Sequence, residues 1–261
     1  MKLSISNIGW DKADDSYMYD YLVDSGFSGI EIAPTRVIEE NPYDHLDEAF
    51  SFKKLMDEKG LIVSSMQSIW FKKDERIFYD EAERKAITEY TKKAIDFAKV
   101  LDCKNLVFGC PRNRSYEELA DIENGLSFFN EVADYAKENG TCFSLEPNPA
   151  IYNTNFINYT KDAFDFVRKI GNDGFKVNVD FGTIVQNDED ISYVAKHVSL
   201  INHVHISEPY LNRIEKREKH NDLASILKGA NYDGFVSIEM KNLGDLQIIK
   251  DTIDYIKGVF V

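Results

Sequence analysis

Residues 175–180 (FKVNVD), 200–206 (LINHVHI) and 235–240 (FVSIEM) are short runs rich in Val, Ile and Phe that carry acidic or His residues near their ends. Apolar runs of this length are typical of strands that are covered on both faces. Five similar runs precede them, at residues 3–8, 29–33, 61–66, 105–109 and 142–147. The sequence therefore predicts eight buried strands.

Segments with helical periodicity separate these runs. The clearest covers residues 80–101, where Ile87, Ala94, Phe97 and Leu101 fall on one face of a helix. Further helices are predicted at 116–139, 160–170, 219–229 and 244–257. Alternating strands and helices predict a closed parallel barrel or a doubly wound sheet. The first strand lacks a G-x-G-x-x-G turn, which favours the barrel.

The chain length is consistent with one such barrel. The protein has 261 residues, and an eight-stranded α/β barrel typically needs about 250. We therefore expect an α/β protein made of a single (β/α)8 TIM barrel with eight parallel strands, and one domain over residues 1–261.

Composition excludes several classes of function. The net charge of −14, without a basic tract, disfavours nucleic acid as a partner. No run approaches the about 18 apolar residues of a membrane span, and the N-terminus lacks an apolar signal core. Cys103, Cys110 and Cys142 show no CxxC spacing, which is typical of buried thiols in a reducing compartment. We expect a cytoplasmic protein without a membrane partner.

Four of the predicted strands carry a polar–apolar–polar triplet near their end. Side chains alternate between faces along a strand, so both polar members of a triplet point the same way. In a barrel they would point inward near the C-terminal ends of the strands, where barrel active sites lie. The triplets are Ser144-Leu145-Glu146, Asn178-Val179-Asp180, His203-Val204-His205 and Ser237-Ile238-Glu239.

The last members of these triplets form a candidate metal site. Three converging carboxylates would repel one another, and one divalent cation bound by Glu146, Asp180, His205 and Glu239 removes that repulsion. Oxygen donors with one His suit Mn²⁺, Mg²⁺ or Co²⁺, with Zn²⁺ as an alternative. A single carboxylate at a strand end is more often a helix cap. Four on successive strands favour the metal.

These segments also resemble a known family. LEPNPAIYNTNF (145–156), VNVDFGT (177–183), HVHISEP (203–209) and YDGFVSIEMK (232–241) are similar to segments of xylose isomerase-like barrels, specifically the sugar phosphate isomerase/epimerase group. FGCPRNR (108–114) and GIEIAPT (29–35) extend the resemblance. The resemblance implies a sugar or sugar phosphate substrate. It also implies that Glu146 and Glu239 are both metal ligands and the acid–base pair, with Asp180 and His205 as ligands only.

The expected reaction is proton abstraction beside a carbonyl group. A bound cation stabilises the enediolate, one glutamate removes the proton and the other returns it, which gives an epimerase or isomerase. Relatives that act on free ketoses carry a His three residues after the Asp, where this chain has Thr183. Members of the group often form dimers or tetramers, so a homo-oligomer is an open alternative to a monomer.

Three other functions remain open. A keto-sugar or inositol-type dehydratase would use the same ion. An endonuclease IV-like phosphodiesterase would need additional His ligands, but Met66, Gln67, Phe108 and Cys110 occupy the ends of the third and fourth strands. The third alternative is a ligand-binding barrel without catalysis, which the intact set of metal ligands disfavours.

Further side chains are candidate substrate contacts. An arginine at a barrel mouth can hold a phosphate or carboxylate, or pair with a surface acid instead. Tryptophans can form apolar walls for a sugar, although most are core residues. An inward-facing glutamate or histidine can contact substrate or orient a metal ligand. The candidates are Arg112, Arg114, His203, His220, Lys241, Glu31, Trp10 and Trp70.

Overall fold

The computed structural model describes residues 1–261 and contains one eight-stranded parallel sheet. Each strand pairs with a neighbour in the order β1-β8-β7-β6-β5-β4-β3-β2. A bridge between Ser6 and Glu31 joins the two ends of this order and closes the barrel. All eight predicted strands are present: β1 (Lys2–Ile5), β2 (Gly29–Ile32), β3 (Ile62–Met66), β4 (Leu106–Phe108), β5 (Phe143–Leu145), β6 (Phe175–Asp180), β7 (Ile201–Ile206) and β8 (Phe235–Ile238).

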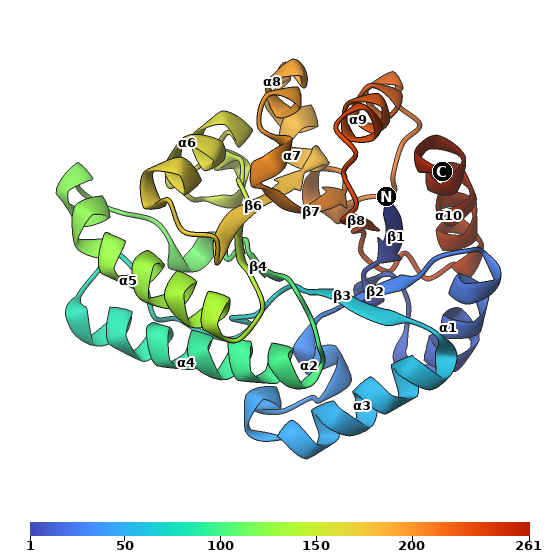
Figure 1. Ribbon diagram of the computed structural model, residues 1–261, viewed down its shortest axis with the longest axis horizontal. Coiled ribbons are helices and arrows are strands. Elements are labelled where there is room, and N and C mark those ends of the chain that lie inside the picture. The colour runs from blue at the N-terminus through green and yellow to red at the C-terminus, as the bar shows by residue number, and fades with distance from the viewer.

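Helices form a ring outside the strands (Figure 1). The five helices predicted by range are α4 (Glu81–Val100), α5 (Leu119–Glu138), α6 (Thr160–Ile170), α9 (Glu218–Gly229) and α10 (Leu246–Phe260). The ring is completed by α1 (Asp15–Asp24) and α3 (Leu46–Lys59), with short helices α2 (Pro34–Val37), α7 (Phe181–Gln186) and α8 (Ser192–Ala195). The structure is thus the predicted (β/α)8 TIM barrel.

The long helices begin and end where their sequences favour it. The Asp80 side chain caps α4 by accepting the backbone N–H of Glu83 at 2.8 Å, which satisfies one of the free N–H groups of the first turn. The Asp245 side chain caps α10 in the same way. Helix α3 ends at Gly60, whose φ of 78° is left-handed and therefore accessible to glycine without strain.

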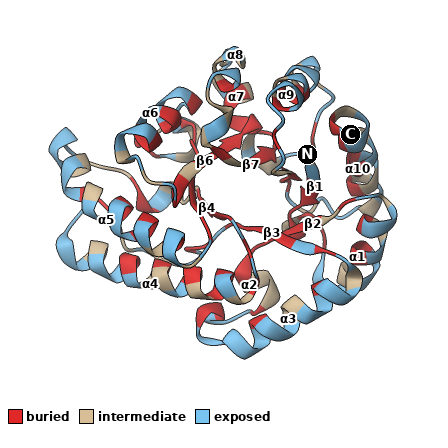
Figure 2. Ribbon diagram, viewed as in Figure 1, coloured by how far each residue is buried: buried red, intermediate tan, exposed pale blue.

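The hydrophobic core lies between strands and helices, as the buried residues in Figure 2 show. The middle members of the four triplets, Leu145, Val179, Val204 and Ile238, are all 0% exposed and belong to this core. A cluster of aromatic rings, including stacked Phe108 and Phe143, fills the space beneath α5. Burying each such side chain contributes about 1.5–3 kcal/mol.

Polar side chains occupy the barrel interior below the strand ends. The Asn105 amide donates to Ser65 at 2.9 Å and its oxygen accepts from Ser144 at 2.5 Å. Ser4 and Ser64 bond each other at 2.5 Å. These bonds satisfy buried polar groups that would otherwise be costly. The polar members of the strands therefore face inward and the apolar members face the helices.

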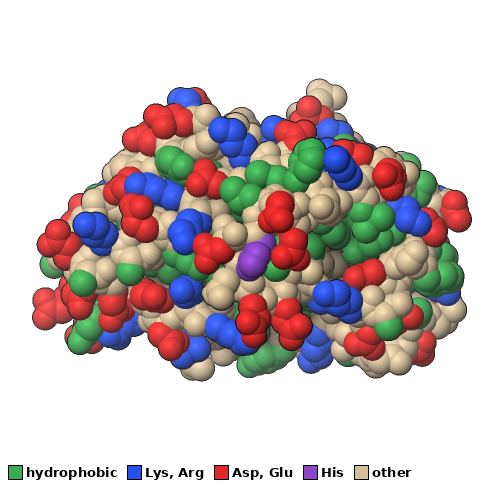
Figure 3. Space-filling view, turned by 90° about the horizontal axis from the view of Figure 1, so that it is seen from below, with side chains coloured by type: hydrophobic (Ala, Val, Ile, Leu, Met, Phe, Trp, Pro, Cys, Tyr) green, Lys and Arg blue, Asp and Glu red, His purple; other side chains and the backbone are tan.

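The surface and the cysteines agree with the composition. Acidic and basic side chains are interspersed on the face shown in Figure 3, without a continuous basic patch on that face. Cys103 and Cys142 are buried, Cys110 is partly buried, and all three are free thiols. None of the helices is both long and apolar enough to cross a membrane.

Candidate metal centre and catalytic site

The four predicted metal ligands come together at the C-terminal ends of the last four strands. Asp180 ends β6 and His205 lies in β7, while Glu146 and Glu239 directly follow β5 and β8. The backbone N–H of Glu146 bonds Phe108 at 3.0 Å, and that of Glu239 is anchored in the same way. All four are at most 8% exposed. One donor atom from each lies within 4.8 Å of the others.

Amide groups hold the Glu146 carboxylate in place. The Asn178 side chain donates to Oε1 at 2.8 Å, and the Asn148 side chain donates to Oε2 at 3.1 Å. Gly109 lies against this carboxylate so closely that a Cβ atom there would lie 2.6 Å from Oε2. The absence of a side chain at Gly109 therefore makes room for Glu146.

Asp180 is held by three hydroxyl and backbone donors. Its Oδ2 atom accepts the backbone N–H of Thr183 at 2.8 Å and the Thr183 hydroxyl at 2.7 Å. Its Oδ1 atom accepts a hydrogen bond from Ser207. Thr183, which stands where the resembling ketose enzymes carry a His, therefore fixes a ligand here and also donates to the Pro147 carbonyl at 2.8 Å.

The electrostatics of the four residues favour a cation between them. Burial, together with the charge of Glu146, raises the pKa of Asp180, and burial raises the pKa of Glu239. Burial alone would lower the pKa of His205, but Glu31 and Glu239 raise it well above its ordinary value. The site thus contains more carboxylates than cationic groups to balance them. Three oxygen donors and one imidazole fit a divalent ion in both charge and chemistry.

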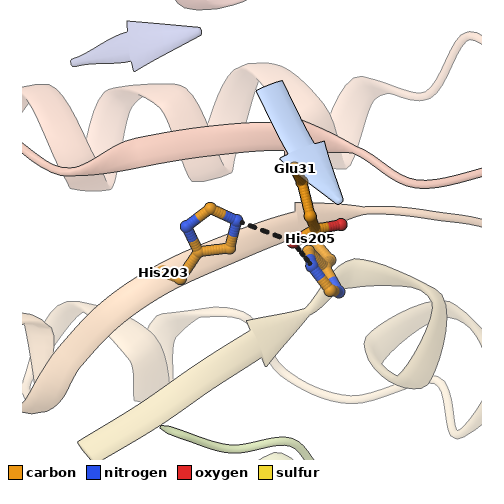
Figure 4. A group of neighbouring side chains, drawn as sticks. All are labelled: Glu31, His203 and His205. Atoms are coloured by element: carbon orange, nitrogen blue, oxygen red, sulfur yellow. Dashed lines mark hydrogen bonds and ion pairs between the residues drawn. The ribbon is translucent and has the colours of Figure 1, made fainter. Parts of the chain in front are cut away.

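Glu31 and His203 lie beside His205, one of the four residues of this site (Figure 4). Glu31 Oε2 is 2.7 Å from His205 Nε2 and 3.3 Å from His203 Nε2. All three side chains are at most 1% exposed. Burial alone would raise the pKa of Glu31, but His205 and His203 lower it well below its ordinary value. Glu31 contacts the proposed ligand His205 through Nε2, whereas Glu146 and Glu239 contact the same ring through Nδ1.

Comparison with known proteins places this architecture in a family. The model of the xylose isomerase-like TIM barrel family matches residues 19–259. The chain belongs to this family. No curated protein matches the chain significantly in sequence.

Several solved structures share the fold over nearly their whole length. The chain is 20% identical to 3-keto-D-glucoside 4-epimerase from E. coli, with 99% of both chains covered and a TM-score of 0.81. For D-psicose 3-epimerase from Clostridium cellulolyticum H10 the identity is 17%, the coverage 100% and 99%, and the TM-score 0.82. An AP endonuclease family 2 structure from Brucella melitensis matches at 18% identity, with coverage of 100% and 97% and a TM-score of 0.75.

As in other barrels, a cavity opens above the strand ends. It has a volume of about 310 Å³, and Glu146, Asp180 and Glu239 form its floor. The wall comes from loops after β3, β4, β5 and β7 and includes side chains that the sequence analysis did not select: Gln67, Lys72, Lys73, Asn148, Tyr152, Glu208 and Leu211. Asn148, Tyr152 and Glu208 lie within the segments that resemble the family, and that resemblance could have identified them as candidate site residues.

Two of these wall residues are held by defined contacts. Burial raises the pKa of Tyr152 to about 12, and its hydroxyl accepts the backbone N–H of Tyr210 at 2.7 Å. Glu208 is 4% exposed, and the Arg217 guanidinium pairs with both of its oxygens at 2.7 Å. Arg217 lies in the charged segment 212–219, so one function of this segment is to balance the charge of Glu208.

Two of the predicted substrate contacts line the cavity. Arg112 is exposed at its mouth and pairs with Asp74. Trp70 contributes to the wall, although it is only 3% exposed and its indole N–H donates to Thr91 at 3.0 Å. Glu31 and His203 lie beneath the ligands and outside the cavity.

Arg114, which the sequence predicts as a substrate contact, does not line the cavity. Its side chain is fully buried, and its guanidinium donates to the backbone carbonyls of Phe108, Glu146 and Ile157 at 3.3, 2.7 and 3.2 Å. Burial lowers the pKa of this guanidinium to about 10. Arg114 therefore ties the loops after β4 and β5 together.

Three other predicted substrate contacts also lie outside the cavity lining. Trp10 is 2% exposed and its indole N–H donates to Asp15 at 2.9 Å. His220 is buried against Phe181, with Nδ1 2.9 Å from the Tyr255 hydroxyl. The exposed Lys241 ammonium donates to Asn212 at 2.9 Å. None of these three side chains lines the space above the carboxylates.

Proposed function

We propose that this protein is a divalent-metal-dependent epimerase or isomerase of a sugar or sugar derivative. Glu146, Asp180, His205 and Glu239 would hold the ion, and Glu146 and Glu239 would also act as acid and base. The observation that carries the proposal is the convergence of these four donors on successive strands, at the floor of a cavity of about 310 Å³.

The cavity suits a small polar substrate. Its volume of about 310 Å³ is at the lower end of the about 300–1,000 Å³ of typical ligand sites, so a monosaccharide-sized molecule fits better than a polymer. The wall offers amide donors from Gln67 and Asn148 and cations from Lys72, Lys73 and Arg112. A keto sugar can use the amides, and a phosphorylated one can also use the cations.

The arrangement of the two glutamates supports transfer of a proton beside a carbonyl. A divalent ion in this site would supply stabilisation of the negative charge that develops on the carbonyl oxygen when the proton leaves. Both Glu146 and Glu239 reach the cavity, and they contact His205 Nδ1 at 2.8 and 3.2 Å. One carboxylate can take a proton and the other can return it. Return to the same carbon gives epimerisation, and return to its neighbour gives isomerisation.

The names of two proteins with similar structures agree with this reaction. The E. coli protein is named a 3-keto-D-glucoside 4-epimerase, and the Clostridium protein a D-psicose 3-epimerase whose structure contains D-tagatose. We propose a keto sugar or a keto derivative of a sugar as the substrate class. A keto-sugar or inositol-type dehydratase would use the same floor of carboxylates and differs in the group that leaves.

A phosphodiesterase with a cluster of zinc ions fits the residues less well. The second group of potential ligands, Glu31, His203 and His205, shares His205 with the first. Glu31 and His203 are 0% and 1% exposed and do not line the cavity. A phosphate ester above the carboxylates would therefore face one ion and not a cluster.

The test combines metal binding with solvent exchange. Metal-stripped protein is titrated calorimetrically with Mn²⁺, and the loaded protein is then incubated in D₂O with keto sugars, free and phosphorylated, and followed by NMR. We expect one ion per chain and deuterium at the carbon beside the carbonyl. Glu239→Gln should lose both metal binding and deuterium exchange. Glu138→Gln, which changes an exposed glutamate at the end of α5, should keep both. Mn²⁺ binding without exchange in any keto sugar would refute the proposed reaction.

A further inference from the structure

A chain of contacts runs from the proposed metal ligands into the barrel. His205 Nδ1 lies 2.8 Å from Glu146 Oε1 and 3.2 Å from Glu239 Oε2, on the cavity side. On the other side, His205 Nε2 lies 2.7 Å from Glu31 Oε2. Figure 4 shows Glu31, on β2, between His205 and His203 of β7. The two nitrogens of His205 therefore face different carboxylates.

We propose that Glu31 is a positioning residue that fixes the orientation and tautomer of His205 for metal binding through Nδ1. A neutral imidazole has one N–H donor and one lone pair. With an ion held among the four proposed ligands, Nδ1 would present its lone pair to the ion, so the hydrogen lies on Nε2, where Glu31 Oε2 at 2.7 Å accepts it. This inference rests on the metal site of the proposed function, but not on the substrate or the reaction.

The backbone at Glu31 lies at an irregularity in β2 and pairs with strands on both sides. The register between β2 and β3 shifts between Ile30 and Glu31, and such irregularities re-aim the side chain that follows. Glu31 also forms the bridge to Ser6 that closes the barrel. A carboxylate at this seam is held by both neighbouring strands, so it can keep the His205 ring in one orientation.

His203 supports Glu31 from the opposite side. Its Nε2 lies 3.3 Å from the same Oε2 atom that contacts His205. All three side chains are at most 1% exposed, so water does not compete for these contacts. Strand β7 carries both imidazoles two residues apart on one face. The strand therefore fixes the distance between the two rings that the Glu31 carboxylate contacts.

The expected effect is on metal affinity. Carboxylates that orient a metal-bound His typically contribute 10–100-fold to affinity. Glu31→Gln keeps the shape of the side chain but removes its charge, and its amide can donate to Nε2 and so favour the wrong tautomer. We therefore expect Glu31→Gln to weaken Mn²⁺ binding by about 10–100-fold. Glu189→Gln is the matched control, because Glu189 is a partly buried glutamate that bonds Thr160 and Asn187 outside the barrel.

Nitrogen NMR tests the tautomer without any substitution. The chain has five histidines, so each ring can be resolved in protein loaded with diamagnetic Mg²⁺ or Zn²⁺. We expect the His205 hydrogen on Nε2 and metal coordination at Nδ1. A hydrogen on Nδ1, or coordination through Nε2, would overturn the inference.

Calorimetry separates the remaining outcomes. One ion per chain in the unchanged protein, with weaker binding in Glu31→Gln and unchanged binding in Glu189→Gln, supports the inference. Equal affinity in Glu31→Gln would overturn it while leaving the proposed metal centre intact. Two ions per chain, one lost with Glu31, would overturn it by making Glu31 a ligand. An unchanged protein that binds no metal would overturn both proposals.

Discussion

Replacing Gly109 by Ala should damage the metal site while sparing the fold. A Cβ atom at this position would lie 2.6 Å from Glu146 Oε2, 3.6 Å from Asn148 Oδ1 and 3.7 Å from Glu146 Cδ. Gly109 is not among the glycines with positive φ, so its backbone is open to alanine. The single severe contact is therefore with the carboxylate of a proposed ligand.

The effect on metal affinity depends on how far the new Cβ atom displaces the Glu146 carboxylate. Non-bonded heavy atoms settle at about 3.5 Å, so the carboxylate oxygen must retreat by about 0.9 Å. Metal–ligand distances tolerate about 0.2 Å, so Oε2 cannot keep its position toward an ion shared with Asp180 and Glu239. We expect Mn²⁺ affinity to fall by about 100-fold, in line with the cost of misplacing a group by about 1 Å. The free energy of unfolding should change by less than about 1 kcal/mol, because the clash falls on a side-chain end.

Calorimetric titration with Mn²⁺ and urea unfolding measure the two effects separately. Gly258→Ala is the control, since Gly258 lies in α10 and a Cβ there meets nothing within 4 Å. The control should bind Mn²⁺ normally and gain slightly in stability from the better helix former. The reasoning fails if Gly109→Ala binds Mn²⁺ within twofold of the unchanged protein. It also fails if the substitution unfolds the chain, because the clash would then fall on structure and not on the ligand.

Three further predictions concern residues away from the ligands. Arg114→Met removes the guanidinium donor from the Glu146 carbonyl, while the carbonyls of Phe108 and Ile157 keep a backbone N–H donor, so urea unfolding should show a loss of about 2 kcal/mol. Burial lowers the pKa of His220 to about 4, so the unfolded chain takes up a proton at His220 at a higher pH than the folded chain does. The contribution of neutral His220 to the free energy of unfolding is therefore complete above about pH 6.5 and is lost as the pH falls toward 4. That loss amounts to about 3 kcal/mol, and His220→Gln should remove this part of the pH dependence of unfolding. Arg112→Gln should raise KM about tenfold for a phosphorylated keto sugar but not for the free sugar, as steady-state kinetics can show, because its guanidinium lines the cavity mouth.

The strands and the convergence of the four donors could be predicted because they depend on two regularities. Side chains alternate along a strand, and parallel strands in a barrel end at the same rim. The spacing of a triplet such as His203-Val204-His205 therefore predicts which way its side chains point. Val204 is fully buried against the helices, and both imidazoles face the interior. No loop conformation enters this inference.

The roles of Arg112 and Arg114 could not be separated in this way. Cys110 has a left-handed φ of 44°, and the turn that follows it, Pro111–Asn113, reverses the chain. This reversal leaves Arg112 at the cavity mouth and turns Arg114 inward onto carbonyl groups. Two arginines two residues apart in a loop have no fixed relation to each other, because the loop has no repeating geometry. The sequence therefore predicted both arginines at the mouth, whereas in the structure only Arg112 lines it.

Strands and loops thus determine different parts of the proposed function. The proposed metal ligands sit on or directly after strands, where the barrel fixes their separation. The wall of the cavity comes from loops such as residues 67–73 and 207–211, and loops vary independently of the scaffold that carries them. Thr183 illustrates the boundary, because it lies in α7, which directly follows β6 in the chain, and its hydroxyl donates to Asp180. It follows that the proposed class of reaction rests on the donors carried by the strands, whereas the substrate must be tested through the loop residues.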